Sequence, residues 1–185
     1  MTTLLVVLVI VGIIVVFFIG TYNRLVTLRQ RIKNAWAQIE VQLKRRYDLI
    51  PNLVNTVKGY ASHERETFEK VTQARNMAIQ AKNVGEQAGA ENMLSGALKT
   101  LFAVAESYPE LKADANFRQL QDELTNTEGK IAFSRQFYND TVMTYNTTIQ
   151  RFPTVLIAGM FGFQKEDYFN LDEEAAAREA VKVEF

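Results

Sequence analysis

The first feature of the hydropathy pattern is an apolar segment at the start of the chain. No charged side chain occurs between Met1 and Asn23, and the apolar run Leu4–Ile19 is interrupted only by Gly12. A helix that spans a bilayer needs about 17–25 residues, so this run is at the short end of the range. We therefore expect residues 1–23 to form a transmembrane anchor. Its membrane-spanning side chains include Leu4, Leu5, Val9, Ile13, Val16, Phe17 and Ile19.

Two other interpretations of the segment fit less well. A cleaved signal peptide carries basic residues before its apolar part and small residues at the cleavage site, and residues 1–20 offer neither. A helix buried in a soluble core keeps one polar side, whereas β-branched residues cover every face here. Arg24, Arg29 and Arg31 directly follow the segment. The positive-inside rule thus predicts a cytoplasmic C-terminal domain, with a periplasmic one as the alternative.

Beyond the anchor, apolar residues recur at helical spacing. No helix breaker separates them from the anchor, so we expect one long helix to leave the bilayer. Asp48 resembles the N-cap of a second helix, with Pro51 in its first turn. The apolar positions of the long helix are Leu25, Leu28, Ile32, Trp36, Ile39, Leu43, Tyr47 and Ile50. The remaining pattern predicts helices over about 48–78, 92–107 and 108–151, with a loop over 82–91.

The last of these helices carries a heptad of bulky residues. We interpret the hydroxyls at the complementary positions as bonded to carbonyls four residues earlier, beside a close neighbour, with a polar groove as the alternative. The bulky positions are Phe117, Leu124, Ile131, Tyr138, Tyr145 and Phe152, and the complementary ones are Leu120, Thr127, Ser134, Thr141 and Thr148.

The predicted fold is therefore all-α. An N-terminal transmembrane helix continues into an antiparallel bundle of three to four long helices over residues 24–152. Residues 153–185 form an apolar segment and an acidic tail, which is a short helix or a strand.

The apolar run at 153–163 is too short to span a bilayer. Three roles are open to it: a cap on the bundle core, an interfacial membrane contact, or a surface for self-association. Its candidate interaction residues are Val155, Leu156, Met160, Phe161 and Phe163, followed by Tyr168 and Phe169.

Composition argues against most catalytic chemistry. The chain has no cysteine and a single histidine, which makes a zinc or copper site improbable. His63-Glu64 begins like a zinc-protease motif, but position 67 is Thr67 and the second imidazole is missing. Lys plus Arg equals Asp plus Glu at 21 each, so the net charge attracts neither nucleic acid nor acidic ligands. We expect no enzyme activity, no cofactor, no metal and no small-molecule substrate.

Lys44, Arg45 and Arg46 form the sharpest charged feature, with Asp48 beside them. These cations favour the C-terminal end of a helix. The alternative is a docking site for an acidic partner, such as the tail of a neighbouring subunit.

The residues resemble the LemA family over nearly the whole chain. The resemblance rests on the block from Gln42 through Lys44-Arg45-Arg46 to Pro51-Asn52-Leu53-Val54, on Lys58-Gly59-Tyr60-Ala61, on Tyr108-Pro109, on Tyr145-Asn146 and on Phe161-Gly162-Phe163. It implies a single-pass protein of the bacterial cytoplasmic (inner) membrane with a long-helix bundle, and no established enzyme activity, cofactor or catalytic residue.

We expect a membrane-anchored helical scaffold or adaptor of the bacterial envelope that assembles with further copies of itself. Its partners are the lipid bilayer, other copies of the chain and, as an option, another membrane protein, without nucleic acid. The alternative function is an accessory regulator that binds a membrane protease or signalling partner through Lys44–Arg46.

Overall fold

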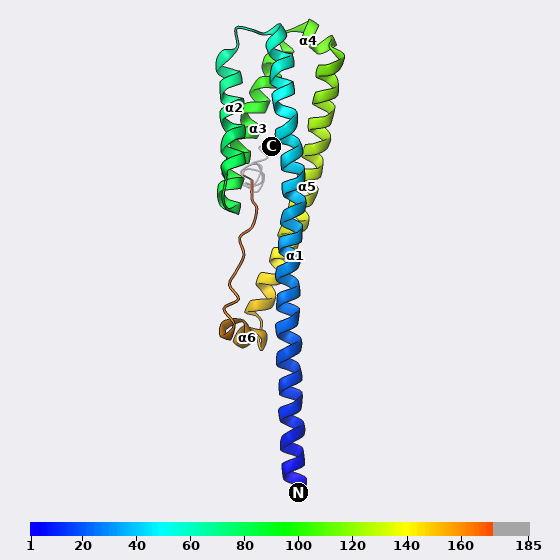
Figure 1. Ribbon diagram of the computed structural model, residues 1–185, viewed down its shortest axis with the longest axis vertical. Coiled ribbons are helices and arrows are strands. Elements are labelled where there is room, and N and C mark those ends of the chain that lie inside the picture. The colour runs from blue at the N-terminus through cyan, green and yellow to red at the C-terminus, as the bar shows by residue number, and fades with distance from the viewer. Residues whose placement is uncertain (172–185) are drawn as a thin grey trace, which may run out of the picture. The chain divides into compact units, whose positions relative to one another are not determined.

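The computed structural model of the chain describes residues 1–171 and shows six helices in them (Figure 1). They are α1 Thr2–Tyr60, α2 Arg65–Gln80, α3 Val84–Glu106, α4 Pro109–Ala113, α5 Ala115–Gln150 and α6 Thr154–Met160. No strand occurs in this part of the chain, and the all-α prediction is confirmed. The acidic tail that we expected as a helix or strand lies outside the described residues.

The predicted continuity between the anchor and the first bundle helix is confirmed. α1 is one helix of 59 residues, and its first part is long and apolar enough to cross a membrane. The side chains of that apolar part are not covered by protein. From Leu25 onward the predicted apolar positions are buried, except for the half-buried Trp36.

The predicted helix boundary at Asp48–Pro51 is wrong, because α1 continues through it to Tyr60. Pro51 has no N–H to donate to the carbonyl of Tyr47, one turn earlier. Arg75 of α2 supplies a replacement donor, with its Nε 2.8 Å from the Tyr47 carbonyl oxygen. A side chain from a neighbouring helix therefore compensates for the bond that the proline removes, and the helix is not broken.

The loop predicted over 82–91 is also wrong, because α3 begins at Val84 and includes both glycines of that stretch. Asn83 caps the helix, with its Oδ1 accepting the N–H of Glu86 at 2.8 Å. The Glu86 carboxylate in turn accepts the N–H of Lys82 at 2.9 Å. This reciprocal pair satisfies donors at the helix start and outweighs the low helix propensity of glycine.

The predicted fourth helix is two helices. The chain leaves α4 at Asp114, whose carboxylate accepts the N–H of Phe117 at 2.8 Å and so caps α5. The predicted heptad of α5 is buried from Phe117 to Tyr145, whereas Phe152 lies beyond the helix end and is exposed.

The interpretation of the complementary positions is confirmed for the hydroxyl groups of the three threonines. Those of Thr127, Thr141 and Thr148 donate to the carbonyls four residues earlier at 2.7, 2.8 and 2.6 Å. These hydroxyls are therefore satisfied within α5 itself.

The described residues divide into two compact units. Unit 1 comprises 1–37 and 136–167, and unit 2 comprises 38–135 and 168–171. The domain boundaries predicted after residues 23 and 152 rest on composition rather than on contacts, and they stay a prediction.

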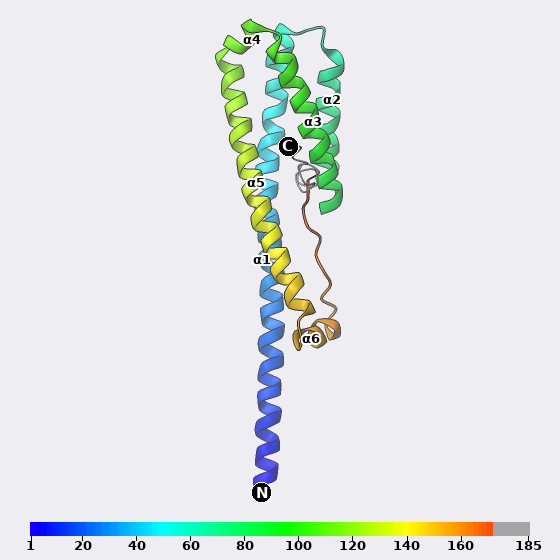
Figure 2. The ribbon, with the colours of Figure 1, turned by 180° about the vertical axis from the view of Figure 1, so that it is seen from behind.

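Within unit 2, the second part of α1 bundles with α2, α3 and the first part of α5. The pairs Arg45–Glu123 and Tyr60–Asp114 show that α1 and α5 run antiparallel there. α2 and α3 lie side by side in both views (Figures 1 and 2). Within unit 1, the ring of Trp36 on α1 packs edge-on against Tyr138 of α5, with 5.4 Å between centroids.

Candidate functional site

The basic block at 44–46 is divided between the surface and the core of unit 2. Lys44 and Asp48 are exposed, whereas Arg45 is half-exposed and forms an ion pair with Glu123 at 2.5 Å. Arg46 is only 4% exposed. Binding of a partner through this block stays a prediction, and Lys44 and Arg45 are the cations that a partner could reach.

Arg46 forms the centre of a buried polar cluster that joins three helices. Its Nη1 lies 3.1 Å from Oε2 of Glu91 on α3. Its Nη2 donates to the hydroxyl of Ser95 at 2.9 Å and lies 3.5 Å from Oε1 of Glu128 on α5. A buried guanidinium needs such partners because an unpaired charge in the core is costly. The side chain therefore holds α1, α3 and α5 together.

Glu91 is the most buried charged group in the cluster, at 1% exposure. Its Oε1 accepts hydrogen bonds from the hydroxyl of Tyr47 and from Nε2 of Gln87, the latter at 3.0 Å. Burial raises the pKa of the Glu91 carboxyl, against the lowering effects of Tyr47, Arg46 and Gln87. Burial and the neighbouring Glu91 also raise the pKa of Tyr47, so the phenol keeps the proton that it donates. Both carboxylate oxygens are engaged by protein, as suits a structural role.

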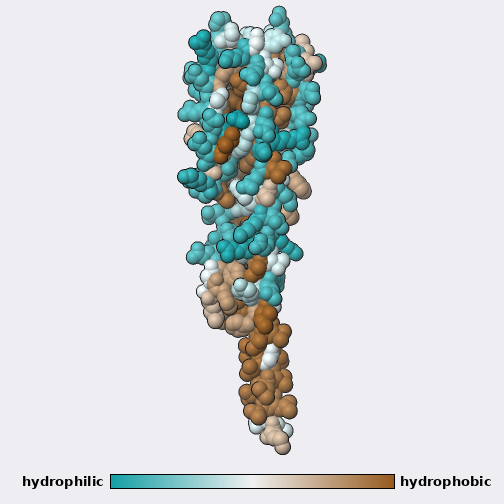
Figure 3. Space-filling model, in the orientation of Figure 1, coloured by the Kyte–Doolittle hydropathy of each residue, from teal (hydrophilic) through white to brown (hydrophobic). Residues whose placement is uncertain are grey.

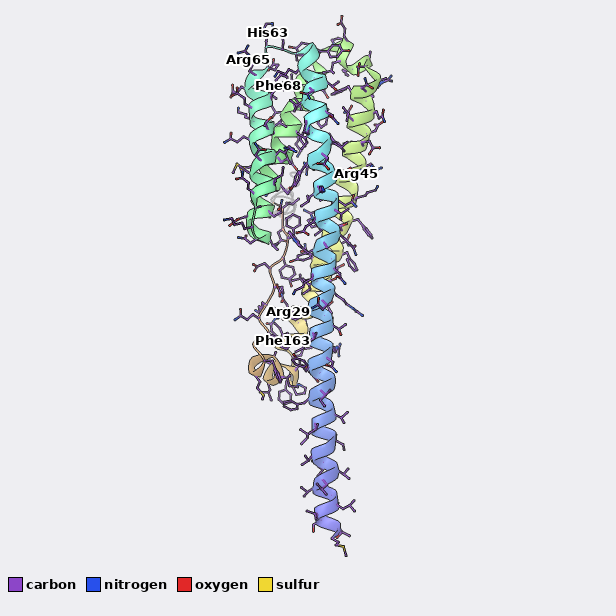
Figure 4. All side chains as sticks on the ribbon, viewed as in Figure 1. Arg29, Arg45, His63, Arg65, Phe68 and Phe163 are labelled. Carbon is purple, nitrogen blue, oxygen red and sulfur yellow. The ribbon has the colours of Figure 1, made fainter. Side chains whose placement is uncertain are left out.

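The other chemistry-bearing residues are scattered. His63 lies in the connection between α1 and α2, near Arg65 (Figure 4). Within residues 1–171 no group of three or more His, Cys, Asp or Glu side chains lies together as a metal site would require.

The apolar run at 153–163 presents most of its large side chains to the outside. α6 buries Ile157 and Ala158, and its Leu156 and Met160 are 58% and 70% exposed. Val155 and Phe161 are also exposed, and Phe163 is half-buried. In the space-filling view, a brown surface at α6 adjoins the apolar first part of α1, both within unit 1 (Figure 3). We call the surface formed by Val155, Leu156, Met160, Phe161 and Phe163 the α6 patch.

Aromatic contacts attach the α6 patch to α1. The ring of Tyr22 lies 4.8 Å from that of Phe161 and 5.8 Å from that of Phe163, centroid to centroid. Gly162 makes the turn between these two rings with a φ of 68°, a conformation that glycine adopts without strain. The N–H of Phe163 then donates to the carbonyl of Ala158 at 2.9 Å and closes the end of α6.

A second attachment follows directly after the patch. The amide of Asn146 on α5 donates to the carbonyl of Glu166 at 2.9 Å and accepts its N–H at 3.0 Å. The Tyr138 hydroxyl donates to the carbonyl of Asp167 at 2.9 Å, and Arg29 on α1 lies 3.7 Å from the Glu166 carboxylate. Burial, followed by the nearby Glu166 and Asp167, raises the pKa of Tyr138 to about 12. The chain segment that returns from α6 is therefore fixed to both long helices of unit 1.

The sequence pattern predicted no role for Glu91 or Asn146. Glu91 stands four residues after Gln87, a spacing that places both on one helix face. The loop predicted at 82–91 hid that signal. Asn146 follows the buried Tyr145, but its partners are backbone atoms of a segment without regular structure, for which the sequence offers no signal. The two aromatic residues expected near the tail differ from each other: Tyr168 is exposed and Phe169 is fully buried.

Comparison with known proteins identifies a family. The model of the LemA family matches residues 35–185. Protein LemA of Metamycoplasma hominis is 29% identical over 87% of this chain and 72% of its own length. The magnetosome protein MamQ 2 of Paramagnetospirillum magneticum is 28% identical over 84% of this chain and 68% of its own length. The magnetosome protein MamQ of Magnetospirillum gryphiswaldense is 26% identical over 80% of this chain and 64% of its own length.

Proposed function

The chain belongs to the LemA family, and from that premise we propose that it is a membrane-anchored helical scaffold that acts by assembly rather than by catalysis. The observation that carries the proposal is the course of α1. Its apolar first part has no protein cover, and its second part lies in the core of a bundle. An uncovered apolar helix of this length is stable in lipid and unfavourable in water.

The buried charges support a structural role rather than a catalytic one. Glu91 has the raised pKa that general acids often show. However, Arg46, Tyr47 and Gln87 already bond to its oxygens, and Glu91 is only 1% exposed, which argues against contact with a substrate.

A shallow groove on unit 2 supports self-assembly. Gln42 of α1 and Gly129, Lys130, Phe133 and Ser134 of α5 line it. Phe133 is 74% exposed. An exposed phenyl ring in a surface groove favours a covering surface that supplies apolar area, and a second copy of the chain provides such a surface.

Light scattering of the detergent-extracted protein tests this assembly. We expect a mass above that of one chain, and a lower mass for Phe133→Ser. Met143→Ser is the matched control, because Met143 is also an exposed apolar residue of α5, at 53%, but does not line the groove. A strictly monomeric wild-type protein would contradict the self-assembly part of the proposal.

A further inference from the structure

The α6 patch has an apolar surface without any charged group of its own. Between Arg151 and Lys165 the chain carries no charge. The side chains that α6 turns outward, among them Leu156 and Met160, are as apolar as those it buries. A surface helix of a water-soluble domain normally has a polar outer face. The patch is therefore more stable against apolar surroundings than in water.

The level of the patch along α1 identifies that environment. The apolar run Leu4–Ile19 extends over roughly 24 Å at 1.5 Å per residue, whereas the hydrocarbon core of a bilayer is about 30 Å thick. No charged side chain occurs before Arg24, so the hydrocarbon core around α1 extends past Ile19 and ends close to Tyr22. Tyr22 is the residue whose ring contacts Phe161 and Phe163. The apolar part of α1 thus ends at the level of the α6 patch.

The residues around this level are those of a membrane–water interface. Tyr22 supplies an aromatic ring with a polar tip, and Arg24 and Arg31 are exposed in the next turns of α1. Aromatic belts flanked by basic residues mark the interface in membrane proteins. The bonds of Asn146 to Glu166 hold the returning chain, and the ring contacts of Tyr22 hold the end of α6 at this level.

We propose that the α6 patch is embedded in the interfacial layer of the same bilayer, beside α1, and that it binds the lipid surface at the boundary of headgroups and acyl chains. The inference rests on the proposed function, since it requires α1 to span the membrane. A second copy of the chain is a weaker occupant. At this level it would displace lipid that is equally apolar, so its docking would gain little from the hydrophobic effect.

The consequence is an anchor with two contacts. A single helix is free to tilt, rotate and shift in a bilayer, and its flanking anchor residues limit these motions. With α6 embedded beside it, α1 has a fixed depth and a fixed rotation. The face of unit 1 that carries α6 then always points toward the lipid.

The absence of cysteine allows a direct test with the full-length protein. Leu156→Cys is labelled with a fluorophore whose emission shifts to the blue in apolar surroundings, and the protein is reconstituted into vesicles of phosphatidylcholine and phosphatidylglycerol. Spin-labelled lipids then quench the fluorescence from either a shallow or a deep position in the bilayer. Ile13→Cys serves as the deep control and Gln136→Cys, exposed on α5 in the same unit, as the water control.

We expect blue-shifted emission at Leu156 and a larger loss of fluorescence with the shallow quencher than with the deep one. Ile13 should show the reverse order, and Gln136 no loss with either. If Leu156 behaves like Gln136 while Ile13 is quenched, the inference is overturned and the proposed anchor stands. If Ile13 is not quenched either, the anchor fails as well. Blue-shifted emission without lipid quenching, together with energy transfer between labelled copies, would show that another copy covers α6 and would also overturn the inference.

Discussion

Replacing Arg46 with methionine is the perturbation whose cost the structure specifies most closely. The change keeps most of the buried length of the side chain and removes its charge. It leaves Glu91, 1% exposed, without its cation and takes a hydrogen bond from Ser95. Removing one partner of a buried ion pair costs about 3–5 kcal/mol, because the remaining charge stays buried and uncompensated. We expect a loss of unfolding free energy in that range.

Arg45→Met is the matched control for this prediction. Arg45 is the adjacent residue and also pairs with a glutamate, but both side chains of its pair with Glu123 are substantially exposed. Pairs of that kind contribute about 0–1 kcal/mol. Urea unfolding of the full-length protein in detergent, followed by circular dichroism, measures both variants. If Arg46→Met lowered the free energy of unfolding no more than Arg45→Met, the cluster would not stabilise the bundle as described.

Three further predictions concern single contacts. Burial raises the pKa of Glu91, so its contribution to stability is full below its unfolded value of 4.5 and is lost as the pH rises through the folded value. Glu91→Gln should therefore reduce the fall in melting temperature as the pH is raised from 4.5, and an unchanged fall would refute the assignment. Arg75→Met should lower the free energy of unfolding by about 1–3 kcal/mol, because the Tyr47 carbonyl loses its donor. In a Pro51→Ala background the loss should be much smaller, since the restored N–H can bond that carbonyl. Equal losses in both backgrounds, measured by urea unfolding, would show that Arg75 does not compensate for the proline. Asn146→Leu should release the segment at 166–167 and speed its cleavage in limited proteolysis. Thr144→Leu, at an exposed position of the same helix, should not change the cleavage rate. Equal cleavage rates in the two variants would show that the bonds of Asn146 do not hold this segment.

The apolar pattern predicted the long elements well because burial follows helical spacing. Leu25 to Ile50 on α1 and Phe117 to Tyr145 on α5 occupy the core at the expected positions. The errors fall where a distant side chain or a local cap overrides propensity. Pro51 is accommodated by Arg75 on another helix, and the Asn83 cap starts a helix that contains three glycines.

The candidate sites were less predictable than the fold. Arg45 and Arg46 are identical in type and adjacent in sequence, yet one is half-exposed and the other buried. The helix rotation that separates them is set by tertiary packing. The apolar character of the α6 patch was evident from composition, but its place beside Tyr22 depends on a turn at Gly162 and on backbone bonds of Asn146 that no periodicity encodes.

The central proposal, that α1 crosses the membrane, is tested most directly by thiol labelling of intact cells, which also tests the cytoplasmic orientation predicted from the sequence. Thr2→Cys reports the N-terminal end of α1, and Gly89→Cys reports α3, where an added Cβ meets no other atom within 4 Å. With an impermeant reagent we predict labelling at Thr2→Cys and protection of Gly89→Cys until the membrane is permeabilised. The reverse pattern would keep the single crossing and overturn the cytoplasmic orientation. Equal labelling of both positions in intact cells would place the two ends of the anchor on one side of the membrane and contradict the account.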